Sequence, residues 1–407
     1  MKVAILGFGV VGSGTAEVLI SNSESIAKKA GEDILLKYIL DIRDFSDNPL
    51  GKLVTNDFEK IIDDGEIKVI AEVMGGVSPA YEYTKRALEK GISVVTSNKE
   101  LVATHGTELL KIARENNANY LFEASVGGGI PVIRPLCQCL SANKVKSIVG
   151  ILNGTTNYIL TKMIKENVSF ESALKEAQDK GYAEKNPAAD IEGIDSCRKI
   201  AILSSLVFGK NVDPNKVYTE GITKITLEDV ELAGKDNKVI KLLGRTYIDE
   251  NEKVSALVSP CLVSKDNPIS GVDDVFNAIT VEGDAVGEVM FYGRGAGKLP
   301  TASAVVADII DAAKHTGKNK GICWEKVGED FVKSHEELET SFFIRVLTED
   351  KNVLEKYVDI VKYIPNIKKT GEICAITKTK KEREILSALK KLENDGIKII
   401  SKIRVLD

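Results

Sequence analysis

The feature that most constrains the fold of this chain is a regular alternation of strand patterns and helical patterns over its first third. Strands are expected at Lys2–Leu6, Ile34–Ile42, Ile67–Met74, Ile92–Thr96 and Asn119–Ala124. Segments with helical spacing, such as 79–90 and 99–116, lie between them. Neighbouring parallel strands need a crossover, and crossover helices cover the faces of the sheet. The pattern therefore predicts an α/β domain with a doubly wound parallel sheet.

A glycine-rich turn directly follows the first strand and opens a helical pattern. It reads Gly7-Phe8-Gly9-Val10-Val11-Gly12. The first glycine permits a tight turn, the second lets a ligand approach the backbone, and the third lets the helix pack closely on the strand. The amides of the helix N-terminus can then bind a pyrophosphate. In this strand–turn–helix context the motif predicts a dinucleotide site rather than a purely structural turn.

The end of the second strand bears on which nicotinamide cofactor binds. An acid at this place binds a ribose 2′-hydroxyl, whereas an arginine pairs with a 2′-phosphate. Asp41 is expected to face the sheet, and Arg43 lies nearer the end of the strand. We favour NADP, with Arg43 holding the phosphate. A solvated Arg43 with NAD as the cofactor stays open.

A second polar segment, Thr96-Ser97-Asn98-Lys99-Glu100, lies at the end of a later strand. Doubly wound sheets place their ligands at this edge, so Thr96 and Ser97 can bind a ribose or a nicotinamide amide, and Lys99 can reach cofactor or substrate. The alternative is an ordinary strand-to-helix turn that is capped by Ser97 or Asn98 and carries an exposed lysine.

The middle of the chain mixes strands and helices and is predicted to be an α+β domain. Strands are expected at Val145–Leu152, Val254–Val263 and Gly287–Tyr292, and helices at Asn157–Glu166, Ser169–Lys180, Asp190–Phe208, Thr226–Leu242 and Thr301–Lys314. The segment 317–336 is interpreted as a polar linker. For a chain of 407 residues we predict three domains, 1–132, 133–316 and 337–407.

The last seventy residues or so follow a β-α-β-β-α-β order. Strands are expected at 341–348, 367–370, 372–377 and 397–406, and helices at 352–361 and 380–395. This order is typical of a ferredoxin-like fold.

The strongest indication of catalysis is the pair Asp195 and Lys199. The two residues lie one helical turn apart, and Ile200–Phe208 after them contains no charged residue. An exposed salt bridge at this spacing would contribute only ~0.3–0.5 kcal/mol. A helix that is apolar nearly all round is buried, however, and a buried lysine must be paired or used. Lys199 is therefore predicted to bind substrate or to act as a general acid–base group.

Polar residues upstream extend this prediction. Glu184 and Asp190 lie in a segment interrupted by Pro187, and two carboxylates beside a lysine suit a substrate with an ammonium group. Equally, Asp190 could be a helix cap and Glu184 a surface residue. The segment 153–160 contains Thr155, whose hydroxyl either caps a local turn or faces a polar substrate.

Composition excludes several classes of protein. The net charge of −5 gives no reason to expect nucleic acid as a partner. Three histidines in unrelated contexts argue against a histidine-based zinc site or a Ser-His-Asp triad, and the six scattered cysteines are interpreted as reduced core thiols. No apolar run can span a membrane and no leader pattern is present, so a cytoplasmic location is expected.

Taken together, these motifs resemble the homoserine dehydrogenase family. The resemblance is carried by the segments 7–12, 96–100, 123–131, 153–160, 181–199 and 295–302. It implies that the chain interconverts L-aspartate 4-semialdehyde and L-homoserine with NAD(P), on the route to threonine and methionine. Hydride would pass between nicotinamide and the aldehyde carbon, with Lys199 as the proton donor in reduction.

The resemblance also assigns roles to individual residues. It implies that Asp195 orients the proton-transfer group, that Lys99 lies near substrate and nicotinamide, that Glu184 and Asp190 bind substrate, and that Gly297 touches the cofactor. It further implies a monovalent cation such as sodium, held mostly by backbone carbonyls at Glu123, Val126, Gly128 and Ile130.

For the middle domain, 133–316, the resemblance implies a role in substrate binding, catalysis and dimerisation, and for the whole chain a homodimer or homotetramer. For the tail, it suggests an ACT regulatory domain and a possible amino-acid effector. The ligand turn of ACT domains usually carries glycine, often after proline, and Thr348-Glu349-Asp350-Lys351-Asn352 has neither. The sequence therefore argues against feedback binding of threonine and favours a role of the tail in assembly.

Two other functions were compared with this one. A different amino-acid dehydrogenase, such as aspartate-semialdehyde dehydrogenase, would need a nucleophilic cysteine in an activating environment, and no cysteine here has one. A nucleotide-sensing regulatory protein would bind NADPH without reducing NADP in the presence of homoserine. It would leave Asp195 and Lys199 unexplained.

Overall fold

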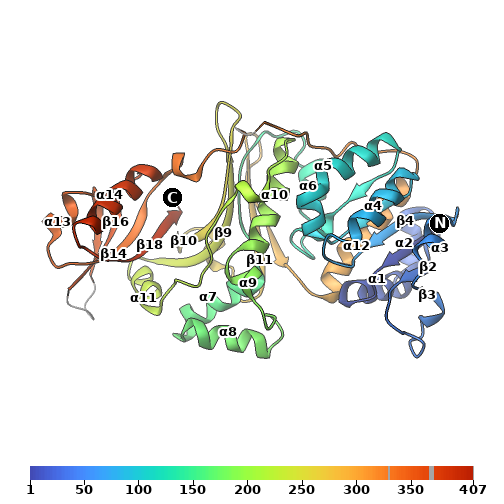
Figure 1. The fold of residues 1–407 in the computed structure, drawn as a ribbon, viewed down its shortest axis with the longest axis horizontal. Helices are drawn as coiled ribbons and strands as arrows, with labels where there is room; N and C mark the ends of the chain where they lie inside the picture. Colours follow the sequence, from blue (N-terminus) through green and yellow to red (C-terminus); the bar gives the residue numbers. More distant parts are fainter. Residues whose placement is uncertain (329–330, 366–370, 407) are drawn as a thin grey trace. The chain divides into compact units, whose positions relative to one another are not determined.

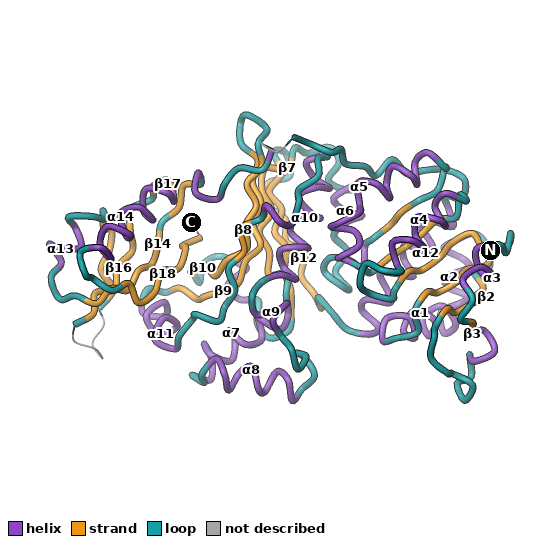
Figure 2. Tube along the Cα trace, viewed as in Figure 1, coloured by secondary structure: helices purple, strands orange, loops and turns teal. Residues whose placement is uncertain are grey.

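The computed structural model describes residues 1–328, 331–365 and 371–406. The chain divides into two compact units, each made of several segments. Unit 1 consists of Met1–Val145, Ala201–Pro214 and Gly283–Gly328, and unit 2 of Lys146–Ile200, Asn215–Glu282 and Glu329–Asp407. Figure 1 labels the elements along the chain, and Figure 2 separates helices from strands by colour. The division into three domains stays a prediction.

Unit 1 contains the predicted doubly wound sheet. Six parallel strands follow the order β3-β2-β1-β4-β5-β6. They are β1 (Lys2–Leu6), β2 (Leu35–Leu40), β3 (Val54–Thr55), β4 (Ile67–Glu72), β5 (Ser93–Thr96) and β6 (Tyr120–Leu121). The order reverses between β1 and β4, and ligands of such sheets bind outside the strand ends at this point. The α/β prediction is confirmed.

Seven helices accompany this sheet in unit 1. They are α1 (Val10–Ser21), α2 (Ser23–Ala30), α3 (Phe58–Ile62), α4 (Ala80–Glu89), α5 (Lys99–Glu115), α6 (Ile133–Gln138) and α12 (Lys298–Lys314). Helix α12 comes from the last segment of the unit and packs against α1, where Val305 and Ile309 join the core beneath β1. A Cβ atom at Gly14 would lie 2.9 Å from the Lys298 carbonyl oxygen, so the two helices approach closely there. Unit 1 also contains β12 (Gly287–Arg294).

Unit 2 is built on a mixed sheet. Its strands follow the order β11-β7-β9-β10-β18-β14-β16-β15, and β8 pairs with β10. They are β7 (Val145–Ile151), β8 (Tyr218–Thr219), β9 (Lys238–Ile248), β10 (Val254–Ser264), β11 (Phe276–Gly283), β14 (Phe342–Leu347), β15 (Ile360–Ile364), β16 (Glu372–Thr377) and β18 (Ile399–Leu406). The long strands β9 and β10 lie side by side in antiparallel register (Figure 2).

Helices pack around this sheet in unit 2. They are α7 (Gly154–Glu166), α8 (Phe170–Asp179), α9 (Ala188–Ile191), α10 (Ile194–Phe208, of which 201–208 belong to unit 1), α11 (Leu227–Lys235), α13 (Lys351–Glu355) and α14 (Glu382–Asn394). A short ladder of β13 (Glu339–Thr340) and β17 (Lys380–Lys381) lies beside the tail.

The tail has the predicted β-α-β-β-α-β order. Its four strands form the antiparallel order β18-β14-β16-β15, as a ferredoxin-like fold requires. Its sheet is continuous with the rest of unit 2, because β18 pairs in parallel with β10 through Cys261 and Arg404. The further description of the tail as an ACT domain stays a prediction.

Three predicted elements differ from the structure. The helix expected at 226–242 ends at Lys235, because Asn237 takes a φ of +54° and Lys238 begins β9. The single helix expected at 190–208 is broken at Gly193, where φ is +82°. The helix expected at 352–361 ends at Glu355, and Ile360 begins β15. The strand expected at 367–370 lies outside the described residues.

Within the described residues, no helix is long and apolar enough to cross a membrane. The six cysteines all lie among the described residues, and none of them forms a disulfide.

Candidate active site

The glycine turn lies at the N-terminus of α1 and has the features of an anion site. Gly7 takes a φ of +96°, and a Cβ atom at Gly12 would lie 1.9 Å from the Gly7 carbonyl oxygen. Both glycines are thus required by the turn itself. At Gly9, by contrast, a Cβ atom would meet nothing within 4 Å, so the protein leaves space above this residue. In the described part of the chain no side chain caps the helix, and Val10 is 67% exposed.

The end of β2 is tied directly to this turn. The Asp41 carboxylate accepts hydrogen bonds from the Phe8 amide (2.8 Å) and from the guanidinium of Arg43 (3.0 and 2.8 Å). The ion pair with Arg43 lowers the pKa of Asp41. Arg43 itself is exposed and lies over the ring of Phe45. The structure thus brings both candidate cofactor-selecting residues to the glycine turn.

The segment after β5 is organised by a residue that the sequence analysis missed. Glu72, the last residue of β4, is fully buried and accepts hydrogen bonds from the Met74 amide (2.9 Å) and the Thr96 hydroxyl (2.6 Å). Burial raises the pKa of this carboxyl group. An acid within the apolar run Ile67–Met74 was the indication that could have identified it.

The same segment ends in a helix cap. Asn98 accepts a hydrogen bond from the Leu101 amide and donates to the Gly76 carbonyl (2.6 Å), so the predicted alternative of an Asn98 cap is confirmed locally. Ser97 and Lys99 follow the strand end and are half-buried. The turn after β4 and the turn after β5 are therefore held together at the ligand-binding edge of the sheet.

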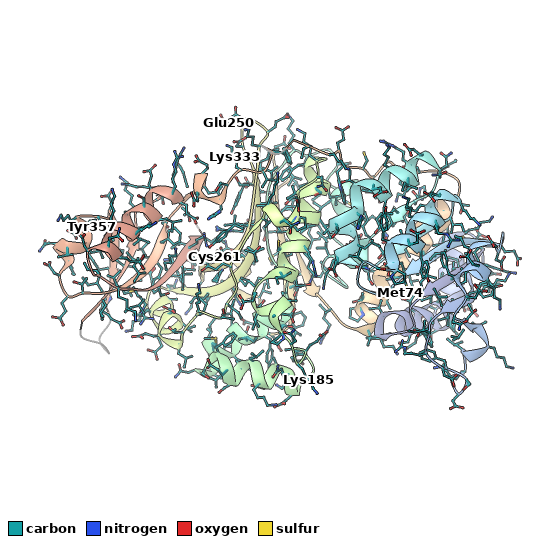
Figure 3. The ribbon with its side chains drawn as sticks, in the orientation of Figure 1. Met74, Lys185, Glu250, Cys261, Lys333 and Tyr357 are labelled. Atoms are coloured by element: carbon teal, nitrogen blue, oxygen red, sulfur yellow. The ribbon has the colours of Figure 1, made fainter. Side chains whose placement is uncertain are left out.

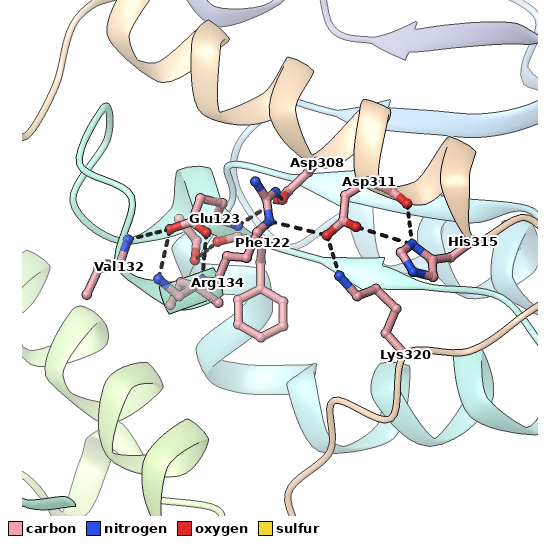
Figure 4. Close-up of polar contacts among 10 residues, drawn as sticks. Phe122, Glu123, Val132, Arg134, Asp308, Asp311, His315 and Lys320 are labelled. Atoms are coloured by element: carbon pink, nitrogen blue, oxygen red, sulfur yellow. Dashed lines mark hydrogen bonds and ion pairs between the residues drawn. The ribbon is translucent and has the colours of Figure 1, made fainter. Parts of the chain in front are cut away.

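Glu123 lies on a single 3₁₀ turn (Glu123–Ser125), and its carboxylate binds the start of a helix. Its carboxylate accepts hydrogen bonds from the three amides at the start of α6, those of Val132, Ile133 and Arg134, at 2.7 to 2.8 Å (Figure 4). Its own amide donates to Asp308, and Arg134 pairs with Asp308 and Asp311. Burial raises the pKa of Asp308 to about 7.

Two glycine-rich loops pack against each other beside Glu123. The Gly129 amide donates to the Arg294 carbonyl, and a Cβ atom at Gly128 would lie 2.3 Å from the Gly295 carbonyl oxygen. Val126 and Ile130 are buried. Gly297 has a φ of +124° and forms the N-cap of α12, the helix that packs on α1. Among the described residues, no group of three His, Cys, Asp or Glu side chains is arranged to hold a metal.

In unit 2, Lys199 lies in a buried polar cluster. Its side chain is only 10% exposed, and Nζ donates to Asp195 Oδ2 (2.7 Å) and to the Leu152 carbonyl (2.8 Å). Ile200 and Leu203 after it are fully buried. The interpretation of this pair as an exposed salt bridge is therefore excluded for the described geometry.

The side-chain amide of Asn153 connects the Asp195–Lys199 pair to Asp190. The Asn153 side chain donates to Asp190 Oδ1 (2.7 Å) and to Asp195 Oδ2 (2.9 Å), and its carbonyl caps α7 by accepting from the Thr156 amide. Asn153 was part of a predicted segment but was not singled out. The structure thus brings together Asp190, Asp195 and Lys199.

Two other predicted substrate residues lie outside this hydrogen-bonded cluster. The Thr155 hydroxyl donates to the Tyr182 carbonyl (2.7 Å) and so holds the loop after α8. Glu184 is exposed on that loop, next to Lys185, which Figure 3 labels. Among the described residues, no hydrogen bond or ion pair joins the Glu184 side chain to Asp190, Asp195 or Lys199.

Comparisons with known proteins agree with this geometry. Residues 7–123 match the family described as "Homoserine dehydrogenase, NAD binding domain", and residues 131–310 match the family "Homoserine dehydrogenase". The homoserine dehydrogenase of Bacillus subtilis (strain 168) is 42% identical over 318 residues, which are 77% of this chain and 73% of that protein.

The chain belongs to the homoserine dehydrogenase family.

Solved structures of the family share the fold. A homoserine dehydrogenase from Thiobacillus denitrificans aligns with a TM-score of 0.92 and 35% identity, over 100% of this chain and 98% of that one. A hyperthermophilic archaeal homoserine dehydrogenase in complex with NADPH aligns with a TM-score of 0.66 and 30% identity, over 76% of this chain and 97% of that one. This chain is thus an oxidoreductase with a nicotinamide-binding domain.

The alternative functions are not favoured. A thioester-forming dehydrogenase needs a thiol with a lowered pKa. Burial instead raises the pKa of Cys137 to about 11 and that of Cys374 to about 12. A sensor without catalysis would not account for the Asp195–Lys199 pair.

Proposed function

We propose that Lys199 exchanges the proton with the substrate oxygen when this enzyme interconverts L-aspartate 4-semialdehyde and L-homoserine. The observation that carries the proposal is the pair of hydrogen bonds from Nζ to Asp195 and to the Leu152 carbonyl. The two hydrogen bonds fix the position of Nζ. In reduction Lys199 gives a proton to the carbonyl oxygen, and in oxidation it takes the hydroxyl proton back.

The carboxylates near Lys199 have separate tasks in this proposal. Asp195 positions Nζ. Asp190 is half-buried and accepts a hydrogen bond from Asn153, and in this proposal it binds the substrate ammonium group. Glu184 supplies a second carboxylate for the ammonium group from the exposed loop. The Thr155 hydroxyl fixes that loop by its hydrogen bond to the Tyr182 carbonyl.

The residues of unit 1 fit a dinucleotide. Among the described residues, no side chain caps the start of α1, so the amides of Val10, Val11 and Gly12 and the open space above Gly9 suit a pyrophosphate. Thr96, Ser97, Lys99 and Gly297 complete the proposed cofactor contacts. When bound, the nicotinamide supplies or accepts hydride at its C4 atom.

We favour NADP over NAD. The exposed guanidinium of Arg43, held by Asp41 and lying over Phe45, can pair with a 2′-phosphate without uncovering a buried charge. If Asp41 instead binds a ribose hydroxyl, NAD is used. Arg43→Ala should raise the KM for NADP by about ten- to a hundredfold, since one charge-assisted contact is worth about 1.5–3 kcal/mol, and should leave the KM for NAD unchanged.

A monovalent cation such as sodium fits the loop after Glu123. The carboxylate of Glu123 is already bound by three amides, so this residue would contribute its carbonyl oxygen. Among the described residues, the carbonyl oxygens of Val126, Gly128 and Ile130 accept no hydrogen bond, and oxygen ligands suit a hard cation. These atoms would hold the ion, whose role here is to fix the loop.

We further propose a homodimer or homotetramer in the cytoplasm. The apolar side chains of Met290 and Tyr292 on β12 are 41% and 55% exposed, which favours self-association. The cytoplasmic assignment follows from the biosynthetic role of the family. An amino-acid effector at the tail remains part of the proposal. Because the ligand turn lacks glycine, threonine is not expected to be that effector, and homoserine oxidation should continue at saturating threonine.

The decisive experiment compares the wild type with Lys199→Ala and Lys199→Arg in homoserine oxidation with NADP and with NAD, with and without threonine. Lys199→Ala should lower kcat by roughly 10²–10⁴-fold, while NADPH binding, followed by its fluorescence, is kept. Near-normal turnover of Lys199→Ala would overturn the assignment. Loss of NADPH binding in the same variant would show that the mutation damages the cofactor site.

A further inference from the structure

We propose that Glu220 is a positioning residue for the reaction: through it, the C-terminal strand β18 holds the turn that carries Asp190 and opens α10. The inference rests on the roles proposed above for Asp190, Asp195 and Lys199. All the contacts that carry it lie within unit 2.

The first step is the fixed position of Arg404 in β18. Its side chain is buried, and the guanidinium donates to both carboxylate oxygens of Glu382 (3.0 and 2.6 Å) and to Glu220 Oε2 (2.8 Å). The guanidinium also lies 4.7 Å from the centre of the Tyr218 ring, which stacks on His335. Because Glu382 holds the guanidinium at two points, Arg404 presents its remaining nitrogen to Glu220 from a fixed position.

The second step leads from Glu220 to the turn. Glu220 follows β8, and its amide donates to the Val258 carbonyl (2.8 Å). The Ile222 amide donates to the Ile191 carbonyl (2.8 Å). Between them, a Cβ atom at Gly221 would lie 2.1 Å from the Ile191 carbonyl oxygen. The backbone at Gly221 is therefore in direct contact with the backbone at Ile191, and a shift of Glu220 would also move Ile191.

The third step leads from the turn to the catalytic cluster. Ile191 is the last residue of α9, and Gly193, with a φ of +82°, separates α9 from α10. A Cβ atom at Gly193 would lie 3.1 Å from Thr219 Cγ2, so the residue before Glu220 packs on the turn as well. Asp190 and Asp195 flank this turn, and the Asn153 amide bonds to both. A displaced turn would therefore change the spacing of these two carboxylates.

A second tail arginine supplies the control. Arg345 in β14 is buried and pairs with Asp229 (2.9 Å), Glu372 (3.0 Å) and Glu228 (2.5 Å). It therefore fixes α11 rather than the turn. The side chains of Glu228 and Glu220 are similarly exposed, at 21% and 24%, and each bonds to a buried tail arginine. Glu228→Gln is thus matched to Glu220→Gln in chemistry and exposure.

The experiment compares Glu220→Gln and Glu228→Gln in steady-state homoserine oxidation, together with the melting temperature of each variant. We expect Glu220→Gln to lower kcat/KM for homoserine by about ten- to a hundredfold, because the neutral amide replaces the carboxylate that pairs with the buried Arg404, with an unchanged KM for the nicotinamide cofactor. Glu228→Gln should stay within about twofold of the wild type at a similar loss of melting temperature. Glu220→Asp, which keeps the charge, should recover part of the activity.

Equal kcat/KM values for the two glutamine variants would overturn the proposal, since Glu220 would then only attach the tail. If Glu220→Gln does not fold, Glu220→Asp is compared with Glu228→Gln instead. A kcat/KM for homoserine equal to that of Glu228→Gln refutes the proposal, and a kcat/KM below it supports the proposal. Failure of the proposed function is recognised separately, by near-normal turnover of Lys199→Ala.

Discussion

Two buried charge clusters of unit 2 look alike in composition but differ in their connections. Asp195 and Lys199 lie one turn apart on α10, and the Leu152 carbonyl and the Asn153 amide also bond to them. Arg345 pairs with Asp229, which lies 116 residues away in sequence, and with two further carboxylates. In the second cluster the charges join two elements, and apolar residues could replace such a group without loss of chemistry. Burial of charge alone therefore does not identify a catalytic site.

The largest effect on stability is expected when the second cluster is broken. Arg345→Met leaves Asp229, which is fully buried, without its cation. The free energy of unfolding should fall by about 3–5 kcal/mol, measured by urea denaturation, while kcat per folded enzyme stays near that of the wild type. A variant that keeps its stability but loses kcat would contradict the distinction between the clusters.

Asp195→Asn tests the other cluster. The variant keeps the shape of the side chain but removes the negative charge that pairs with Lys199. Because a hydrogen bond between charged groups is worth about 1.5–3 kcal/mol, kcat should fall by up to about ten- to a hundredfold, with little change in the KM for the cofactor. Asp229→Asn is the matched control and should mainly lower the melting temperature. The distinction between the two clusters would be refuted if Asp229→Asn lost kcat while Asp195→Asn only lowered the melting temperature.

Two glycines of the turn Gly7–Gly12 also differ in role, one being required by the local structure and the other being expected to contact the cofactor. A Cβ atom at Gly12 collides with the Gly7 carbonyl, whereas a Cβ atom at Gly9 meets nothing. Gly12→Ala should therefore lower both the melting temperature and the cofactor affinity. Gly9→Ala should keep the melting temperature and weaken NADPH binding by about tenfold, or ~1.4 kcal/mol. Unchanged NADPH affinity in Gly9→Ala would show that the space above Gly9 is not used by the cofactor.

The smallest effect is expected from pH at His335 in the tail. Burial lowers the pKa of His335 from its ordinary value of 6.5, although Glu382 lies 3.5 Å away and favours the charged form. Below about pH 6.5 the unfolded chain therefore binds a proton that the folded chain does not, and stability falls as the pH falls through this range. His335→Gln should flatten the dependence of the melting temperature on pH between 5 and 7. An unchanged slope would mean that other groups cause it.

Much of unit 1 could be predicted because its determinants are local. The glycine turn, the strand ends and the Asn98 cap depend on residues that are close in sequence, so their geometry follows from φ preferences and helix termini. The helix expected at 226–242 was wrong for the opposite reason. The apolar spacing of Val239–Leu243 fits a helix, but eleven-residue pairing with β10 makes this segment a strand. Such long-range pairing overrides local preference.

The sequence by itself determined the order of elements, the dinucleotide turn and the pairing of Asp195 with Lys199, since each arises from spacing along one strand, turn or helix. Only the tertiary structure decided that the Leu152 carbonyl and Asn153 complete the lysine site, that Glu72 holds the strand ends together, and that Arg404 reaches Glu220. These contacts join residues far apart in sequence. They form because buried charges and amides must find partners, and which partners lie within reach depends on the packed fold.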